Sequence, residues 1–214
     1  MVTKKLSLRG LAKYMTASPH VQRKILHEFK YPNQAAAAAM RHYYVPATEA
    51  ITLHHADDRG ADWLRQRAAV FDAQAAAEAQ AGRARKLASN AKALRHYARN
   101  FADREFTMRK QPSWRLTYGD VIISVRPDLH VVENGKVKVI RLGFLSQAPD
   151  PRAVRIETQC LFEAAAPALG LTSSQVLHFD VPRASVTRGA RLGARLAKDI
   201  EATCATISTL WDSI

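Results

Sequence analysis

The sequence predicts an α/β protein in which a helical N-terminal half precedes a small mixed β-sheet with flanking helices. Three observations support this prediction. Apolar residues recur at helical spacing through roughly the first hundred residues, in alanine-rich segments. The pattern then changes to short runs of β-branched and aromatic residues. One further helical segment lies between two of these runs, and a helix that connects two strands implies that they pair in parallel.

In the first half, caps and helix breakers mark the expected elements. Ser7 stands before a short helix as its N-cap, and Pro19 is placed at the first position of the next helix. Pro46 should kink or divide the long alanine-rich segment that follows. Gly60 and Gly82 should separate two further helices. The first hundred residues are therefore expected to be helical.

The second half should form the sheet. "WRLTYGDVIISVRPDLHVV" and "KVKVIRLGFL" read as strands, and Asn134-Gly135 between them is a strong hairpin signal. "DPRAVRIETQCLFEAAAPALG" should be the crossover helix and "QVLHFDV" the strand after it. An amphipathic helix from about Ser185 should close the chain. We expect a helical region over residues 1–82 and the α/β core over residues 83–214.

The charge of the chain points to an anionic partner. Its 214 residues carry a net charge of +13, and the first 105 residues hold 18 Lys and Arg against 9 Asp and Glu. Such an excess costs self-repulsion, and a polyanion, most often nucleic acid, is a frequent compensation. A basic surface that serves solubility alone is the alternative.

Three features of the whole sequence indicate the cellular compartment of the protein. The chain has no apolar run of about 18 residues, so no membrane span is expected. Its first residues, "MVTKKLSLRG", lack the apolar region of a secretion signal. Cys160 and Cys204 have neither metal-site nor disulfide-framework spacing and should be core residues. We therefore expect a cytoplasmic protein.

Two stripes of basic side chains are candidate phosphate contacts. The first lies on another side of the helix after Gly82 than its apolar stripe, and it consists of Arg85, Lys92, Arg95 and Arg99. The second, in the first turns of the closing helix, consists of Arg188, Arg191, Arg195 and Lys198. Cations at that end oppose the helix dipole, which is easier to justify if an anion binds nearby. Either stripe could instead be a solvated helix face.

The stretch "RPDLHVVENGKVKVIRLGF" and its surroundings resemble the core of the PD-(D/E)XK nuclease superfamily, especially its RecB-like branch. The resemblance covers roughly residues 85–182. Pro127-Asp128 is similar to the family's acid-bearing pair, and the Asn-Gly hairpin follows it. Gln159 with Phe162 resembles the family's glutamine motif. The resemblance implies a restriction-endonuclease-like fold.

In that family two carboxylates hold Mg²⁺ or Mn²⁺ and a lysine positions the attacking water. The acid-x-lysine position falls here on Arg141-Leu142-Gly143, so arginine replaces the second acid and glycine the lysine. An arginine about 4 Å from a divalent ion costs roughly 8 kcal/mol at an effective dielectric constant near 20. We expect an ion pair between Arg141 and Asp128 in the metal's place, and no bound cofactor.

A rearranged site is the alternative. Glu157 on the crossover helix could replace the missing acid, and His130, on the same strand face as Asp128, could contribute. Such a site would use Mg²⁺ or Mn²⁺. Lys138 should point to the other face of its strand, away from Arg141.

Two further placements concern polar residues outside this site. Glu133 should be solvated beside the hairpin turn. Adjacent histidines on a helix diverge by about 100°, so His54 and His55 are expected at the surface rather than around a metal ion.

The favoured function is therefore nucleic-acid binding, with DNA as the first candidate, on a core that no longer hydrolyses. Three residues join the two stripes as expected contacts: Arg126, Arg141 and Gln159. A metal-dependent nuclease is one alternative. Another is an interaction subunit or inhibitor that docks on an acidic protein, and the oligomeric state stays open.

Overall fold

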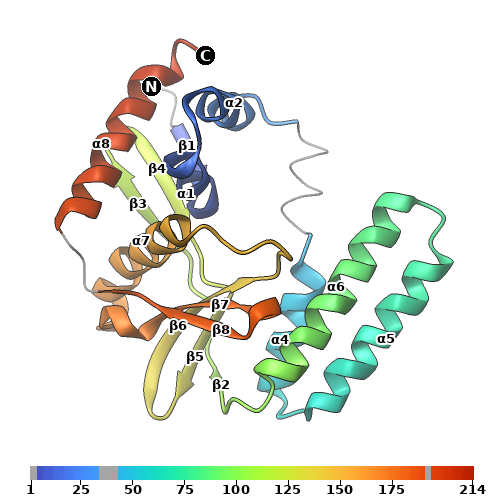
Figure 1. Ribbon diagram of the computed structural model, residues 1–214. Coiled ribbons are helices and arrows are strands. Elements are labelled where there is room, and N and C mark those ends of the chain that lie inside the picture. The colour runs from blue at the N-terminus through green and yellow to red at the C-terminus, as the bar shows by residue number, and fades with distance from the viewer. Residues whose placement is uncertain (1–3, 34–42, 191–193) are drawn as a thin grey trace.

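The computed structural model describes residues 4–33, 43–190 and 194–214. Within these ranges the chain is an α/β protein with seven α-helices and two mixed β-sheets (Figure 1). The predicted α/β class is confirmed. The finer expectation, a restriction-endonuclease-like core, stays a prediction.

The first sheet contains a strand that the sequence did not predict. Its strands, in spatial order, are β1 (Lys4–Ser7), β4 (Val121–Val125) and β3 (Trp114–Tyr118). β1 pairs in parallel with β4, so the expectation of helices alone in the first hundred residues was wrong. The inward positions of β1 are Lys4 and Leu6. Because a lysine occupies one of these two positions, the sequence of this four-residue strand does not show the alternation of apolar residues that would predict a strand.

The second sheet contains the predicted hairpin and crossover, together with two edge strands that the sequence did not predict. Its strands, in spatial order, are β2 (Thr107–Met108), β5 (Leu129–Glu133), β6 (Lys136–Gly143), β7 (Val176–Asp180) and β8 (Ser185–Arg188). β3 and β4 lie in the first sheet rather than in one sheet with β5 and β6 as expected. Asn134 and Gly135 both have positive φ, as a two-residue hairpin turn of type I′ requires. β6 and β7 pair in parallel, joined through the helix α7 (Pro151–Leu169). The hairpin and the parallel crossover are both confirmed.

The closing helix begins later than predicted. α8 spans Ala194–Trp211, and Ser185–Arg188 forms the edge strand β8 antiparallel to β7. Val186 and Thr187 are β-branched and favour this extended pairing. The expectation of a helix from about Ser185 was therefore wrong.

The helices of the first half follow most of the expected signals. They are α1 (Leu8–Thr16), α2 (Pro19–Lys30), α4 (Val45–Ala56), α5 (Ala61–Ala77) and α6 (Ala81–Asn100). Ser7 caps α1, where its Oγ accepts a hydrogen bond from the Gly10 amide at 3.1 Å. Pro46 lies in the first turn of α4, and Gly60 caps α5. Gly82 lies inside the first turn of α6, so it does not separate α5 from α6 as predicted. Much of the alanine-rich segment, residues 34–42, lies outside the described residues.

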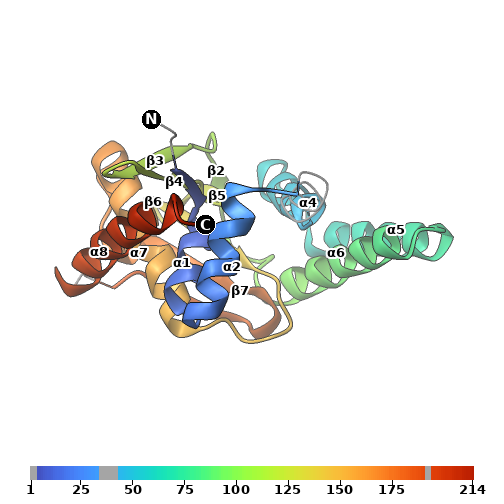
Figure 2. The same cartoon turned by 90° about the horizontal axis from the view of Figure 1, so that it is seen from above.

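Two apolar clusters build the core. One packs α1, α2, α7 and α8 around the first sheet and against one face of β6 and β7, and the other packs α4, α5 and α6 against the opposite face of the second sheet. Figure 2 shows the first group of helices together and the α5–α6 hairpin extending away from it. Leu11 and Ile207, from the two sides of the expected boundary at residue 82, share one cluster. The division at that boundary stays a prediction.

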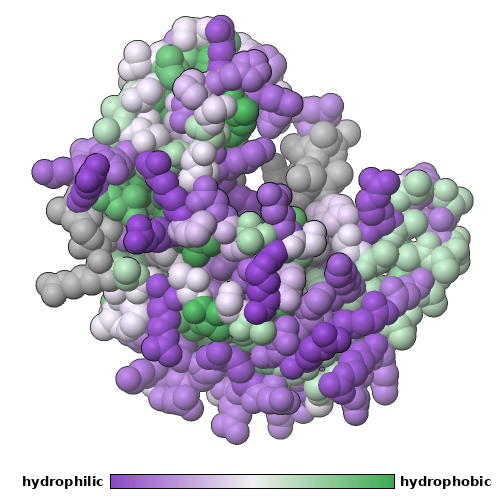
Figure 3. All heavy atoms as spheres, in the orientation of Figure 1, coloured by the Kyte–Doolittle hydropathy of each residue, from purple (hydrophilic) through white to green (hydrophobic). Residues whose placement is uncertain are grey.

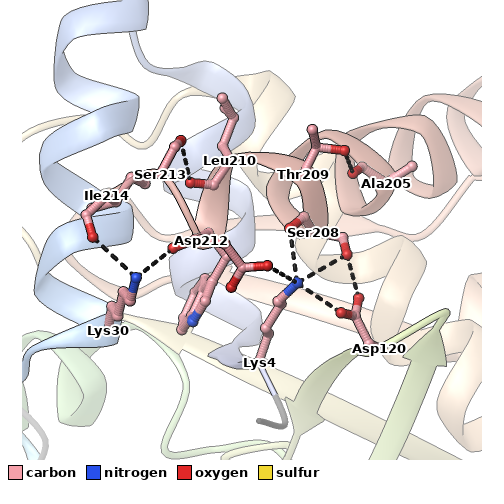
Figure 4. Close-up of polar contacts among 11 residues, drawn as sticks. Lys4, Lys30, Asp120, Ala205, Ser208, Thr209, Leu210, Asp212, Ser213 and Ile214 are labelled. Atoms are coloured by element: carbon pink, nitrogen blue, oxygen red, sulfur yellow. Dashed lines mark hydrogen bonds and ion pairs between the residues drawn. The ribbon is translucent and has the colours of Figure 1, made fainter. Parts of the chain in front are cut away.

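Two lysines fix the C-terminal end of α8 (Figure 4). Buried Lys4 donates to the Ser208 carbonyl at 2.8 Å and pairs with Asp120 at 2.7 Å. Lys30 donates to the carbonyls of Trp211 at 2.7 Å and Ile214 at 3.0 Å. Cations at a helix C-terminus complement its dipole and its unsatisfied carbonyls. These contacts hold α8 against β1 and α2.

Gly189, directly after β8, should tolerate no side chain. A Cβ atom there would lie 2.6 Å from the Ser173 carbonyl oxygen, a backbone atom that cannot rotate away. We expect Gly189→Ala to lower the free energy of unfolding by about 1–3 kcal/mol in urea titrations. Gly82→Ala is the control, because nothing lies within 4 Å of its added Cβ. It should stabilise α6 by roughly 0.5–1 kcal/mol, and equal effects of the two substitutions would contradict the packing.

Candidate functional site

Arg141 joins three elements at the centre of the candidate site. It lies on β6, and its Nη1 is 2.9 Å from Asp128 Oδ2, just before β5. Its Nε lies 3.6 Å from Glu157 Oε2 on α7. The predicted ion pair with Asp128 is therefore present, and Glu157 completes a triad around one guanidinium.

The backbone of β6 fixes Asp128 beside Arg141. The Asp128 amide donates to the Ile140 carbonyl at 2.8 Å, and the Leu142 amide donates to Asp128 Oδ2 at 2.8 Å. Arg141 Nη1 also donates to the Arg126 carbonyl at 3.2 Å. Asp128 is thus held through its backbone by Ile140 and through its carboxylate by Leu142, the residues on either side of Arg141, so the pairing follows from the strand register.

The surrounding charges keep Arg141 cationic. Its side chain is 13% exposed, and burial alone would lower its pKa. The carboxylates of Asp128 and Glu157 outweigh burial, and the pKa of Arg141 is raised. A divalent ion at the same carboxylates would meet this permanent charge, so the arrangement opposes metal binding.

His178 occupies the space beside Gly143, where the resemblance places the lysine. A Cβ atom on Gly143 would lie 3.1 Å from Cε1 and 3.2 Å from Nε2 of the His178 ring. This ring is buried on the neighbouring strand β7, and burial lowers its pKa. A lysine at position 143 would require the ring to shift.

Gln159 makes its contacts inside the protein. It is buried on α7, where its Nε2 donates to Glu163 Oε1 at 2.6 Å. The hydroxyl of Tyr118 donates to the other Glu163 oxygen at 2.6 Å. A phosphate contact by Gln159 stays a prediction, and it would require this side chain to leave Glu163.

His130 and Arg126 are held at the edge of the site. His130 Nδ1 lies 2.8 Å from the Lys110 carbonyl oxygen, so Nδ1 carries the proton of that contact. Arg126 is exposed, and its Nη2 donates to Gln111 Oε1 at 2.7 Å. No hydrogen bond or ion pair joins the described side chains of His130 and Asp128.

The predicted basic stripes have different outcomes. All four residues of the first stripe are exposed on α6, but Arg95 forms an ion pair with Asp72 of α5. The second stripe is divided, because Arg188 lies in β8 rather than in the closing helix. Arg195 is exposed in the first turn of α8, while Arg191 lies outside the described residues.

Two polar residues are buried against expectation. Glu133, predicted to be solvated, accepts two hydrogen bonds at 2.8 Å from Arg104 and pairs with Lys138. Burial raises the pKa of Glu133, but these cations outweigh burial and lower it. The residue in the sequence that could have indicated this cluster is Lys138, three residues before Arg141. Lys138 was predicted to point away from Arg141, and its ion pair with Glu133 agrees with that prediction.

His54, predicted at the surface, is 3% exposed because α4 packs against the segment after α6.

Comparisons with known protein families, characterised proteins and solved structures found no match. Among the residues that the structure describes, no cluster of three or more His, Cys, Asp or Glu side chains could hold a metal ion. No helix in the described ranges is both long and apolar enough to cross a membrane. Cys160 and Cys204 are buried as predicted, and burial raises the pKa of both thiols.

Replacing Arg141 by methionine should be strongly destabilising. The variant leaves the carboxylates of Asp128 and Glu157 without their shared cation, at side-chain exposures of 25% and 10%. We expect a loss of about 3–5 kcal/mol in the free energy of unfolding, the usual cost of breaking a buried ion pair from one side. Urea titrations measure this loss.

Added MgCl₂ should recover part of the loss in Arg141→Met and leave the parent protein unchanged. Arg126→Met is the matched control, because it also removes one guanidinium but no ion pair. A loss of under 1 kcal/mol in Arg141→Met, or an equal Mg²⁺ response in the parent, would contradict the arrangement.

Proposed function

We propose that this chain binds nucleic acid through α6 and that its nuclease-like core does not perform metal-dependent hydrolysis. The observation that carries the proposal is the composition of α6. The helix contains six Lys and Arg residues and no Asp or Glu. A helix that only needs solvation generally mixes both signs of charge, because opposite charges three or four residues apart stabilise it.

Three cations of α6 form one row. Arg85, Lys92 and Arg99 are seven residues apart, so they share one face of the helix. The row spans about 21 Å at 1.5 Å per residue, a length that extends over several phosphates of one strand. It lies opposite the buried Leu94. We call Arg85, Lys92 and Arg99 the α6 row.

The α6 row is available to a ligand. None of its three side chains has an acidic partner within the described residues, whereas Arg95 is neutralised by Asp72. Burial and the charges of Lys92 and Arg99 lower the pKa of His96, which indicates a positive potential along this surface. Figure 3 shows strongly hydrophilic side chains gathered over α6.

The core supports binding rather than hydrolysis in this proposal. Arg141 holds the carboxylates that would bind a metal ion, and His178 fills the space beside Gly143. DNA is the first candidate ligand because the resemblance is to nucleases that act on it. Arg126 at the edge of the site would add a contact to the phosphate backbone of the nucleic acid.

A metal-dependent nuclease with a rearranged site is the second candidate. The observation that favours it is that Asp128 and Glu157 converge on the same guanidinium. Mg²⁺ or Mn²⁺ would have to displace Arg141 to use them. An acidic protein partner would be attracted by the same basic row, and an absence of binding to both DNA and RNA in the test below would favour it.

The binding test compares two triple variants of equal charge. The first replaces Arg85, Lys92 and Arg99 of the α6 row with glutamine. The control replaces three exposed cations of α1 and α2 that have no acidic partner in the described part of the chain: Lys13, Arg23 and Lys24. Fluorescence polarisation measures binding to labelled double- and single-stranded DNA, with RNA as a further arm, over a range of KCl concentrations.

We expect the α6 variant to reduce the slope of log K against log[KCl] by about 2–3 for duplex DNA, because each lost phosphate contact contributes about 0.9. The control variant should change the slope by less than 1. Equal changes in the two variants would show that net charge alone sets binding. An unchanged slope in the α6 variant would remove this helix from the proposal.

A further inference from the structure

Three aromatic side chains form a continuous group between α6 and the loop after β6. The ring centroids of Tyr43 and Tyr44 are 5.0 Å apart, and those of Tyr44 and Phe144 are also 5.0 Å apart. The two tyrosines directly precede α4, and Phe144 directly follows β6. Figure 1 shows the loop after β6 running out to the start of α4. We call Tyr43, Tyr44 and Phe144 the aromatic cluster.

The aromatic cluster begins beside the α6 row. The hydroxyl oxygen of Tyr43 lies 3.1 Å from Ser89 Oγ on α6. Ser89 is four residues after Arg85 and three residues before Lys92, so it neighbours both cations on the helix surface. An aromatic ring and cations without acidic partners in the described chain therefore lie side by side.

A buried asparagine fixes this placement. Asn90, the residue after Ser89 on α6, is 0% exposed. Its Nδ2 donates to the Tyr43 carbonyl at 2.8 Å, and its Oδ1 accepts from the Ala47 amide at 2.9 Å. The Ala47 amide is one of the first four of α4, which have no partner inside their own helix. Asn90 thus ties both the tyrosine segment and the start of α4 to α6, and it holds the rings in place before any ligand binds.

The rings of the aromatic cluster keep surface open to solvent. All three are half-buried. Tyr44 and Phe144 lie at the margin of the second apolar cluster, whereas Tyr43 packs against neither cluster of the described residues. Core packing therefore accounts for the position of Phe144 and Tyr44 in part and for that of the Tyr43 ring not at all.

A second cation lies near the far end of the aromatic cluster. Burial and the neighbouring Tyr43 raise the pKa of Tyr44, and the positive charge of Arg9 on α1 opposes this rise, so Arg9 is close enough to act on Tyr44. Arg9 is exposed and has no acidic partner among the described residues. Aromatic rings with cations on both sides are the composition of sites that bind single strands, in which bases stack on the rings and cations contact phosphates.

We propose that the aromatic cluster stacks unpaired bases of a single-stranded nucleic acid whose phosphates contact the α6 row. This inference rests on the proposed nucleic-acid function and names the class of strand that the surface takes. The bases of a duplex are already stacked on one another, so a duplex can contact the α6 row but not the aromatic cluster. DNA and RNA strands share the chemistry of stacking, and the test separates them.

Fluorescence polarisation tests the proposal with labelled single strands of equal length. One is DNA, one is RNA, and one is an abasic DNA strand that keeps the sugars and phosphates but has no bases. We expect the parent protein to bind the base-bearing DNA at least tenfold more tightly than the abasic strand, because each stacked base contributes roughly 5- to 150-fold. The ratio of the DNA and RNA affinities then identifies the preferred strand.

Two double variants separate the rings from the rest of the surface. Tyr43→Leu with Phe144→Leu removes two rings and should abolish the preference for bases, while the abasic affinity and the KCl dependence stay unchanged. Tyr43→Phe with Phe144→Tyr is the matched control, because it keeps both rings and loses only the hydroxyl contact to Ser89. The control should keep the preference of the parent protein.

The outcomes distinguish this inference from the function on which it rests. Equal affinities of the parent protein for the base-bearing and abasic strands would overturn the stacking site and leave binding through the α6 row standing. An absence of binding to every strand would overturn the proposed function and this inference with it. A ring-free variant that keeps the preference for bases, or that loses abasic binding by the same factor, would also overturn the stacking site, because the rings would then be dispensable or only structural.

Discussion

The pairing of Arg141 with Asp128 and Glu157 is the interaction on which the account of this site depends. It links the start of β5, the middle of β6 and the crossover helix α7 through one guanidinium. Each carboxylate would be costly to bury alone, and their mutual repulsion is relieved only by a cation between them. A metal ion can supply that charge, and here an arginine from the chain supplies it permanently.

Different helices build the two apolar clusters. α7 and α8 pack in the cluster around the first sheet, and α4, α5 and α6 pack against the second. This packing leaves the outer face of α6, with Arg85, Lys92 and Arg99, free of acidic partners in the described chain. This face of α6 therefore does not depend on the Arg141 triad, which makes the proposal of binding without hydrolysis coherent.

Local sequence signals predicted much of the second sheet, but they did not predict the strand β1 of the first sheet. Asn134-Gly135 specified a hairpin through its positive φ angles, and α7 fixed the parallel pairing of its flanking strands. β1 was missed because it pairs with β4, more than a hundred residues away, and carries a buried lysine. The Arg141–Asp128 pair followed from counting along the strands. The burial of His54 and Glu133 did not follow, because it depends on the packing of the α6–β2 segment.

The most direct test asks whether the core cuts DNA. Supercoiled plasmid and single-stranded DNA would be incubated with the protein and with Asp128→Ala, in Mg²⁺, in Mn²⁺ and in EDTA. Gel mobility would be read for cleavage and for band shift. The account predicts a salt-sensitive shift without cleavage, equal in all three solutions and in the variant. Metal-dependent cleavage that disappears in Asp128→Ala would contradict it, because Arg141 would then yield its place to a metal ion.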